Sequence, residues 1–392
     1  MTDLIETANK HFIPVYQRYP VILDHGEGVY LYDQTGKKYL DFGSGIGVCA
    51  LGYGHPVYTA SLQKQLAALS HTSNLFYNEP AIQAARLFNQ SSGMDKVFFT
   101  NSGTEAIEGA IKIAHKYHYL KTGKHDGQII AMKNSFHGRT MGALSVTGKI
   151  AYQKPFQPLL TNVRFATFND SNSVKALINE HTCAIILETI QGEGGIYQAD
   201  QQFLHDIYSW CQKYSILLIL DEIQCGMGRT GKMFAYQHYD IIPDIVVSAK
   251  ALGCGVPVGA IGIAQQISHV LAPGDHGTTY GSNPLSAKAV QTVFEIYQQE
   301  HILKHVQEMG QYLEQKLKSI VTKYSMIKEI RGLGLMKGIE LTVPAKTYIE
   351  KLQQEGIIVI PSGTHIMRLL PPLIIEKQHI DHFIATLEKI LQ

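Results

Sequence analysis

Three charged residues of this 392-residue chain directly follow short apolar runs, at positions where they could carry out chemistry. Glu188 follows AIIL, Asp221 follows ILLIL and Lys250 follows IVVSA. Such runs are typical of strands that are buried on both faces of a parallel sheet. Because ligands of open α/β sheets bind beyond the carboxyl ends of the strands, these three side chains are candidates for one site.

Lys250 has small or apolar neighbours on both sides, in the sequence VVSAKALG. Desolvation lowers the pKa of a lysine and makes its amine a usable nucleophile. A single lysine after a strand is more often a solvated loop charge, because lysine is mostly exposed in proteins. Lys250 therefore indicates amine chemistry only in combination with other residues.

Asp221 is open to two interpretations. A carboxylate at the floor of a sheet can pair with a protonated ring nitrogen of a bound heterocycle and keep that ring an electron acceptor. The sequence ILLILDE fits a helix cap about equally well. The first role also requires an aldehyde-binding lysine and a phosphate site.

A candidate phosphate site lies at Asn101–Ala106 (NSGTEA), where an apolar run, KVFFT, turns through glycine into a helical pattern. Free N–H groups at a helix start attract anions. Ser102 and Glu105 also form a capping-box pattern, which is compatible with anion binding. A second candidate is the Gly/Thr cluster HGTTYG at residues 276–281.

The segment GMGRTGKM, residues 226–233, is similar to the start of a P-loop. Met233 stands where that motif needs the magnesium-binding Ser or Thr, and the segment follows DEIQC rather than a strand. An ATPase is therefore rejected.

The sequence patterns of the helices and strands that would position these residues predict an α/β fold. Residues 28–42 alternate in character around a turn signal and predict an antiparallel hairpin. Apolar runs between about residues 95 and 263 predict a mainly parallel sheet, and long helical patterns follow residue 283. We expect a large domain over residues 56–285 and a smaller α+β domain formed by residues 1–55 and 286–392.

The composition excludes several classes of partner. Lys and Arg total 34 against 33 Asp and Glu, a net charge of +1, so neither a nucleic acid nor a membrane surface is indicated as a partner. The five cysteines are too widely spread to predict a zinc site, and we expect no metal. Reduced thiols and a polar start without a signal pattern favour a cytoplasmic protein.

The ordered series NSGTEA, SFHGRT, ETIQGEGG, LDEIQCGMGRTG, SAKALG, HGTTYGSNPL and RLLPPL resembles the class III pyridoxal-phosphate (PLP)-dependent aminotransferases. The resemblance extends from about residue 14 to the end of the chain and implies the PLP-dependent transferase fold type I. The N-terminal GVYLYDQTGKKYLDFGSGIGVCALGYGHP and the segment HTSNLFYNEP look most like the acetylornithine aminotransferases within this family.

The resemblance implies a role for each motif residue toward the cofactor. Lys250 would bind PLP as a Schiff base and then move protons, and Asp221 would pair with the pyridinium. The other implied cofactor contacts are Phe136 and Ile223 on the ring faces, Gln224 near the ring hydroxyl, Gly103 and Thr104 at the phosphate, and Thr279 from a second subunit. The last contact implies a homodimer with shared active sites.

The resemblance also implies how two carboxylate substrates bind. Arg139 would hold the α-carboxylate of acetylornithine, and Arg368 that of glutamate or 2-oxoglutarate. Glu193 would neutralise Arg368 when that substrate is absent, and Tyr16 would contact substrate. Ile46 stands where ornithine aminotransferases tend to carry a tyrosine, which disfavours free ornithine.

The predicted reaction moves the amino group of N2-acetylornithine to 2-oxoglutarate and gives N-acetylglutamate semialdehyde and glutamate, a step of arginine biosynthesis. Aminotransferases acting on 4-aminobutyrate, ornithine or succinylornithine remain alternatives, because the sequence leaves the donor and the acyl group open. A glutamate-1-semialdehyde aminomutase is disfavoured by Arg368 and Glu193. A non-catalytic PLP-binding regulator would need a DNA-binding segment, and no basic segment is left over.

Overall fold

A seven-stranded sheet forms the centre of the computed structural model, which describes residues 2–392. All its neighbouring strands run parallel except β12, which is antiparallel to both of its neighbours. In spatial order the strands are β4 (Lys96–Thr100), β12 (Gly259–Ile263), β11 (Ile245–Ser248), β10 (Leu217–Asp221), β7 (Thr182–Glu188), β5 (Gln128–Met132) and β6 (Val163–Ala166). The predicted apolar runs all lie in this sheet, and only the edge strand β6 was missed.

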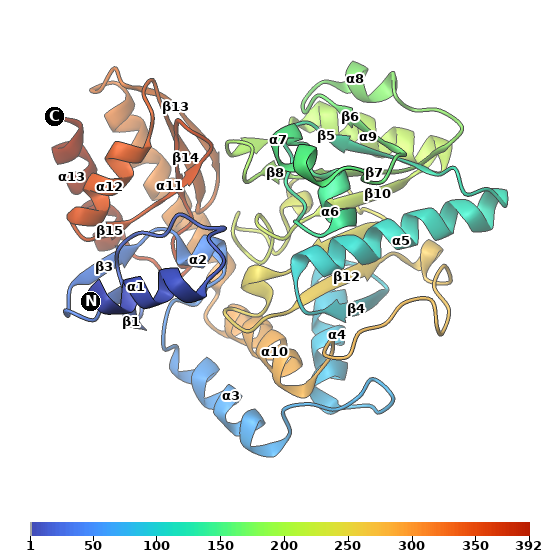
Figure 1. Cartoon of the computed structure of the whole chain (residues 1–392), viewed down its shortest axis with the longest axis horizontal. Helices are drawn as coiled ribbons and strands as arrows, with labels where there is room; N and C mark the ends of the chain where they lie inside the picture. Colours follow the sequence, from blue (N-terminus) through green and yellow to red (C-terminus); the bar gives the residue numbers. More distant parts are fainter. Residues whose placement is uncertain (1) are drawn as a thin grey trace.

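Both faces of this sheet are buried, which explains the uninterrupted apolar runs. Along β7, Ala184 and Ile186 pack into one hydrophobic cluster, while Ile185 and Leu187 pack into another on the opposite face. Helix α5 (Gly103–Thr122) covers the first face and α9 (Gln201–Tyr214) the second, as the two layers around the sheet in Figure 1 show. The buried core therefore fixes the carboxyl ends of the strands.

A second lobe, at the left of Figure 1, contains both termini and two four-stranded sheets. The predicted hairpin is confirmed, since β2 and β3 pair antiparallel around the turn at Asp33–Gly36. Strand β3 also pairs in parallel with β15, so the two ends of the chain share one sheet. The strands are β1 (Leu23–Glu27), β2 (Tyr30–Asp33), β3 (Lys38–Asp41) and β15 (Ile357–Ile358) in one sheet, and β13 (Ile327–Leu333), β14 (Met336–Leu341), β17 (Ile366–Leu369) and β16 (Ile360–Ser362) in the other.

The pairing of β3 with β15 supports a smaller domain built from both chain ends, although the boundaries at residues 55 and 285 stay predictions. Near the second boundary, α10 (Pro284–Gln299) packs against α3 (Pro56–Ala68) and α4 (Glu79–Ser92). The smaller lobe also holds α11 (Ile302–Val321), α12 (Lys346–Gln354) and α13 (Lys377–Leu391). Shorter elements are α1 (Thr2–His11), α2 (Ser44–Gly47), α6 (Met141–Val146), α7 (Ile150–Gln153), α8 (Ser171–Lys175) and the two-residue strands β8 (Ile190–Gln191) and β9 (Tyr197–Gln198).

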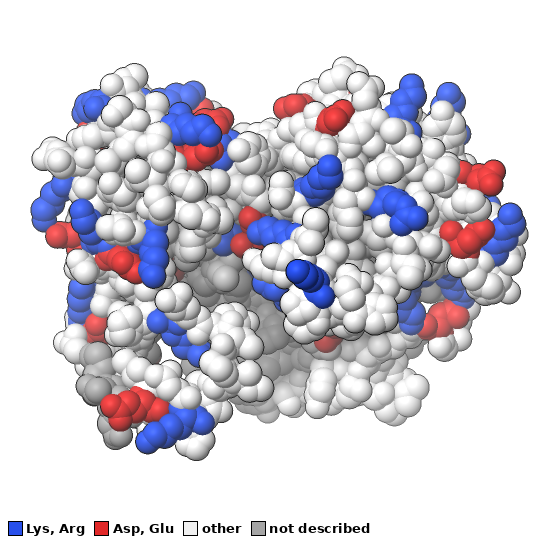
Figure 2. Space-filling view, turned by 45° about the horizontal axis from the view of Figure 1, so that its top comes forward, with Lys and Arg blue, Asp and Glu red and all other residues white. Residues whose placement is uncertain are grey.

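Basic and acidic side chains are intermixed over the face shown in Figure 2, and neither sign dominates it. This distribution fits the nearly neutral net charge of +1. Within residues 2–392, no helix combines the length and the apolar character that a membrane span requires.

Candidate active site

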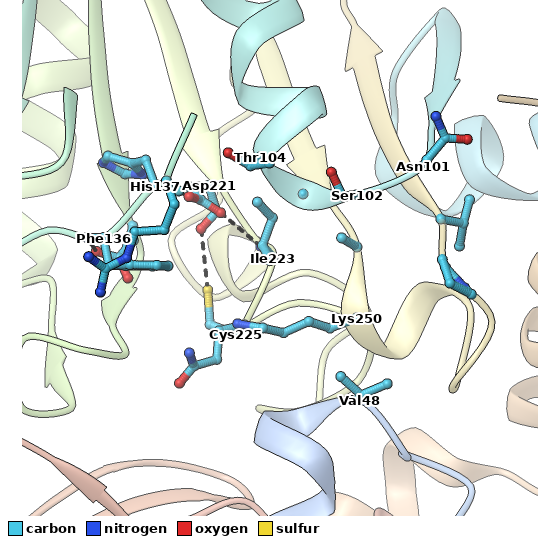
Figure 3. Close-up of a pocket in the computed structure, with 18 of the residues that line it drawn as sticks. Val48, Asn101, Ser102, Thr104, Phe136, His137, Asp221, Ile223, Cys225 and Lys250 are labelled. Carbon is cyan, nitrogen blue, oxygen red and sulfur yellow. Dashed lines mark hydrogen bonds and ion pairs between the residues drawn. The ribbon is translucent and has the colours of Figure 1, made fainter. Parts of the chain in front are cut away.

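A cavity of about 470 Å³ lies at the carboxyl ends of the central strands. The structure brings Glu188, Asp221 and Lys250 together there, and Asp221 stands directly opposite Glu188 in the register of β10 and β7. Figure 3 shows the Lys250 side chain extending into the space below Ile223 and Asp221. This is the place that parallel-sheet topology predicts for a ligand.

Lys250 lies two residues beyond β11 and has a backbone φ of +50°, a left-handed conformation that non-glycine residues rarely adopt. Its amine makes no hydrogen bond or ion pair with any described residue. Burial lowers the pKa of Lys250, and the positive charge of Arg368 adds to this effect, while Asp221 and other carboxylates oppose it. The environment therefore favours a neutral, nucleophilic amine.

Because this amine has no partner and partial burial disfavours its charged form, it destabilises the protein in the absence of a ligand. Replacing Lys250 with methionine is expected to raise the unfolding free energy of the cofactor-free protein by about 1 kcal/mol at pH 7. The pKa of Lys250 is lower in the folded than in the unfolded state, so the native protein gains stability as pH rises toward 10.5. The advantage of the variant should shrink over that range, which urea unfolding at several pH values would measure. An advantage that stays constant up to pH 10.5 would contradict this origin.

Asp221 is 3% exposed and accepts two hydrogen bonds. Its Oδ1 accepts the N–H of Ile223 at 3.0 Å, and its Oδ2 accepts from Nδ1 of His137 at 2.7 Å. Turns rather than a helix follow β10, so Asp221 does not cap a helix. The carboxylate is thus fixed at the wall of the cavity.

His137 is a site residue that sequence reasoning missed. Its side chain is fully buried, and its Nε2 has no hydrogen-bond partner among the described residues. The signal was present in the motif SFHGRT, directly after Phe136, but nothing local indicates that this histidine reaches Asp221 across the sheet. Its bond holds Asp221 in one orientation and adds a donor to the carboxylate.

The start of α5 forms the wall where Gly103 and Thr104 line the cavity. The Ser102 hydroxyl accepts the N–H of Glu105 at 3.2 Å, as the capping pattern predicts. The Glu105 carboxylate accepts the N–H of Asn101 at 2.8 Å, one residue earlier than in a standard capping box. Because the first N–H groups of a helix lack helical partners, this wall can receive an anion.

Gly103 also lies close to Ile223. A Cβ at position 103 would approach the Ile223 Cδ1 to 2.7 Å, so only glycine leaves that side chain in place. Ile223 and Phe136 both line the cavity, as do Gln224 and Asp221. The structure therefore places the predicted ring-contacting residues around one space.

Glu188 joins two loops of the site. One carboxylate oxygen accepts the N–H of Phe136 at 3.1 Å, and the other accepts the N–H of Gly192 at 3.1 Å. Burial raises the pKa of Glu188 to about 7, although the nearby His137 opposes the shift. Its bonds fix the Phe136 loop against the loop that carries Glu193.

Arg368, on β17, is 3% exposed and forms an ion pair with Glu193. Its guanidinium also donates to Oε1 of Gln224 at 3.0 Å and to the carbonyl of Pro361 at 3.0 Å. Burial opposes ionisation of Glu193, but the charge and hydrogen bond of Arg368, together with the charges of Lys250 and Lys149, outweigh burial and lower the pKa of Glu193. The predicted neutralising partner of Arg368 therefore lies in contact with it.

Arg139 differs from Arg368 because it is exposed and forms no ion pair with any described residue. Its guanidinium carbon lies 3.7 Å from the ring centre of Tyr152 and 5.5 Å from that of Phe136. An arginine beside a cavity with no carboxylate partner is available to a carboxylate ligand.

Arg368 and Glu193 lie just behind the cavity lining, where Arg368 donates to the lining residue Gln224. Tyr16, Thr279 and Ile46 also lie outside the lining. Tyr16 is 73% exposed and contacts the side chain of Arg18. Thr279 is exposed, in a loop tied to the start of α5 by a 3.2 Å bond from Asn101 to Thr278. Ile46 is 45% exposed. The roles of Tyr16 and Thr279 stay predictions.

Comparison with known proteins identifies the family. The model of the family described as aminotransferase class-III matches residues 13–391. The acetylornithine aminotransferase of Methanocaldococcus jannaschii is 45% identical over 98% of this chain and 97% of its own length. That of Aquifex aeolicus is 44% identical over 96% and 98%.

Solved structures show the same fold. The ornithine aminotransferase of Toxoplasma gondii superimposes with a TM-score of 0.95 at 30% identity, covering 100% of this chain and 94% of that one. The acetylornithine aminotransferase of Elizabethkingia anophelis gives a TM-score of 0.88 at 30% identity, covering 99% and 98%.

These matches confirm the predicted fold type I, the transaminase activity and pyridoxal 5'-phosphate as cofactor. The ordered motifs, the sheet that positions them and the full-length similarity agree. This chain belongs to the class III aminotransferases.

Proposed function

We propose that this enzyme transfers the amino group of N2-acetylornithine to 2-oxoglutarate, giving N-acetylglutamate semialdehyde and glutamate in arginine biosynthesis. The observation that carries the proposal is the contrast between Arg139, which lines the cavity, and Arg368, which lies behind the lining residue Gln224. Arg139 has a free guanidinium, whereas Arg368 is neutralised by Glu193. The full-length relatives named acetylornithine aminotransferase support the same donor.

The cavity fits pyridoxal phosphate in three respects. An unpartnered amine, Lys250, faces it; a fixed carboxylate, Asp221, lies on its wall; and the start of α5 supplies N–H groups for a phosphate. We assign the phosphate to Gly103 and Thr104, and the ring to the space between Phe136 and Ile223, with Gln224 near its hydroxyl. When bound, the cofactor supplies an aldehyde for amines and a ring that accepts electrons.

Lys250 and Asp221 have different roles toward the bound cofactor. Lys250 Nζ would hold the cofactor through its aldehyde and, as a free amine, would take and return the proton at the reacting carbon of the substrate. Its lowered pKa keeps part of the amine in the neutral form that this requires. Asp221, held by His137 and the Ile223 N–H, would pair with the ring nitrogen of the cofactor and favour its protonated form.

The two half-reactions use different carboxylate sites. Arg139 holds the α-carboxylate of the acylated donor, while the Glu193–Arg368 pair stays closed. When glutamate or 2-oxoglutarate binds, its α-carboxylate replaces Glu193 on Arg368. Because Lys149 donates to the Glu193 carbonyl at 2.8 Å, the backbone of that loop stays anchored while the carboxylate moves.

A panel of amino donors with 2-oxoglutarate tests the donor. We expect kcat/KM for N2-acetylornithine to exceed that for ornithine and for 4-aminobutyrate by at least about tenfold, since neither competitor carries both the acyl group and the α-carboxylate. N2-succinylornithine in the same panel defines the acyl preference. A clear preference for 4-aminobutyrate or free ornithine would overturn the proposed donor.

Ornithine is the second candidate, because the superposition on the Toxoplasma enzyme has a TM-score of 0.95. That similarity is accompanied by 30% identity, against 45% for the Methanocaldococcus relative. Ile46 also lacks the hydroxyl expected of an ornithine enzyme at that position. Both observations favour the acetylated donor.

We further propose a cytoplasmic homodimer in which Thr279 contacts the phosphate bound by the other subunit. Three adjacent side chains, Leu75, Phe76 and Tyr77, are 86%, 68% and 96% exposed, which is unusual for apolar residues unless a partner covers them. Five free cysteines fit a reducing compartment. A solution mass at micromolar concentration tests the assembly, and a fully active monomer would refute it.

A further inference from the structure

We propose that Tyr152 is a positioning residue that holds Arg139 in place for the α-carboxylate of the amino donor, and thereby contributes to donor specificity. The inference rests on the proposed function, because it takes Arg139 as the donor-carboxylate site. Tyr152 does not line the main cavity and carries no charge, so neither position nor residue type marks it as a site residue.

The contact between Tyr152 and Arg139 is close. The guanidinium carbon lies 3.7 Å from the centre of the tyrosine ring, a distance typical of a planar group stacked on a ring face. The ring of Phe136 lies farther away, at 5.5 Å. Tyr152 therefore provides the principal surface against which the Arg139 side chain rests.

This contact leaves the hydrogen-bonding edge of Arg139 free. Stacking uses the face of a guanidinium, whereas a carboxylate binds to the N–H groups at its edge. No described carboxylate pairs with Arg139, so no competing ion pair must break before substrate binds. A free arginine on the surface would instead lose side-chain freedom on binding, which costs affinity.

Tyr152 is itself fixed by the segment that carries it. In α7, the adjacent Gln153 donates to the carbonyls of Leu144, Ser145 and Thr147 at 3.1, 3.2 and 2.9 Å. Just before α7, the Gly148 carbonyl accepts the N–H of Asn134 at 2.9 Å. These bonds tie the segment to α6 and to the end of β5, so Tyr152 forms a rigid support.

The same segment also reaches the second carboxylate site. Lys149 donates to the carbonyl of Glu193, and its amine lies 5.4 Å from the ring centre of Tyr152. One short stretch, residues 149–153, therefore contacts both Arg139 and the loop that closes Arg368. The Tyr152 ring makes its close contact with Arg139, so we expect it to position the donor-carboxylate site and not the Arg368 site.

The test measures binding of an unreactive pair of probes to the PLP-loaded enzyme by calorimetry. N2-acetyl-L-norvaline carries the acyl group and the α-carboxylate of the proposed donor but lacks its reacting amine, and N-butylacetamide lacks the carboxylate as well. Tyr152→Leu is expected to weaken binding of the first probe by about 5- to 20-fold, the range of a cation–π contact, without changing binding of the second. Tyr152→Phe should stay within about twofold of the native enzyme, because the ring face is kept.

Tyr214→Leu serves as the matched control, since Tyr214 is also a surface tyrosine beside a lysine and lies in a hollow remote from the main cavity. It should leave both affinities unchanged. Equal loss for both probes in Tyr152→Leu, or equal loss in Tyr152→Phe and Tyr152→Leu, would overturn the positioning role. If the native enzyme transaminates N2-acetylornithine but Tyr152→Leu binds both probes with native affinity, this inference alone is refuted. Failure of the native enzyme to use N2-acetylornithine would refute the proposed function and this inference with it.

Discussion

Replacing Lys250 with alanine is expected to lower kcat by about 10⁴-fold or more, the largest effect of any single change in this chain. General acid–base catalysis by a positioned side chain contributes up to about 10⁴-fold, and Lys250 also provides the nucleophile that binds the cofactor aldehyde. The cavity walls remain, so the variant should still bind pyridoxal phosphate without a covalent bond. Borohydride reduction and peptide mapping should label Lys250 in the native enzyme and leave the variant unlabelled.

A second buried lysine provides the matched control for this variant. Lys337, on β14, is 1% exposed, and its pKa is lowered by burial although Glu314 opposes the shift. Lys337→Met leaves Glu314 paired with Lys318 at 2.6 Å, so this variant should fold and retain activity. A pyridoxyl label on a lysine other than Lys250, or substantial turnover by Lys250→Ala, would refute the assignment of the nucleophile.

The central sheet could be predicted because burial on both faces produces continuous apolar runs, as in β7 and β10. Strand β6 lacks that signal because it lies at the edge of the sheet and exposes Arg164 to solvent. The antiparallel direction of β12 could not be predicted from the sequence either. Its sequence, GAIGI, is as apolar as that of its parallel neighbours, and strand direction depends on the route of the connecting chain.

The part of the site that could be predicted consists of residues at ends of elements. Glu188, Asp221 and Lys250 follow strands, and Gly103 begins a helix, so topology alone brings them together. The Glu193–Arg368 contact joins residues from the two lobes and entered only through family resemblance. No local pattern could have specified the pairing of two residues so far apart in the chain.

His137 and Tyr152 show why the remainder of the site stayed hidden. His137 reaches Asp221 across 84 positions of sequence, and a histidine in a loop such as NSFHGRT has many possible partners. Tyr152 contacts Arg139 because hydrogen bonds of Gln153 and Gly148 fold the segment back onto β5. Such contacts depend on packing between elements, which residue type and spacing do not determine.

Replacing Asp221 with asparagine is expected to lower kcat by about 10²- to 10³-fold, the usual cost of removing one preorganised electrostatic group from a reacting centre. Asparagine has nearly the same shape and can still accept the Ile223 N–H through its oxygen. His137 can accept from the new amide by changing its tautomer, so the wall of the cavity stays in place. The loss should therefore fall on kcat, with little change in the unfolding free energy, because the negative charge that keeps the ring nitrogen protonated is gone.

Two measurements separate this electrostatic role from a structural one. The absorbance of the bound cofactor should change its pH dependence in Asp221→Asn, since the ring nitrogen loses its proton more easily without the carboxylate. The control is Asp244→Asn. The Asp244 carboxyl is buried and accepts the Leu218 N–H at 2.8 Å. It lies directly before β11, at the amino end of that strand, whereas the site lies at the carboxyl end. Burial raises the pKa of Asp244, so its neutral replacement should leave both kcat and the cofactor spectrum unchanged. An Asp221→Asn enzyme with native turnover would show that the charge is dispensable, and a variant that loses stability together with activity would assign Asp221 to the fold rather than to the reaction.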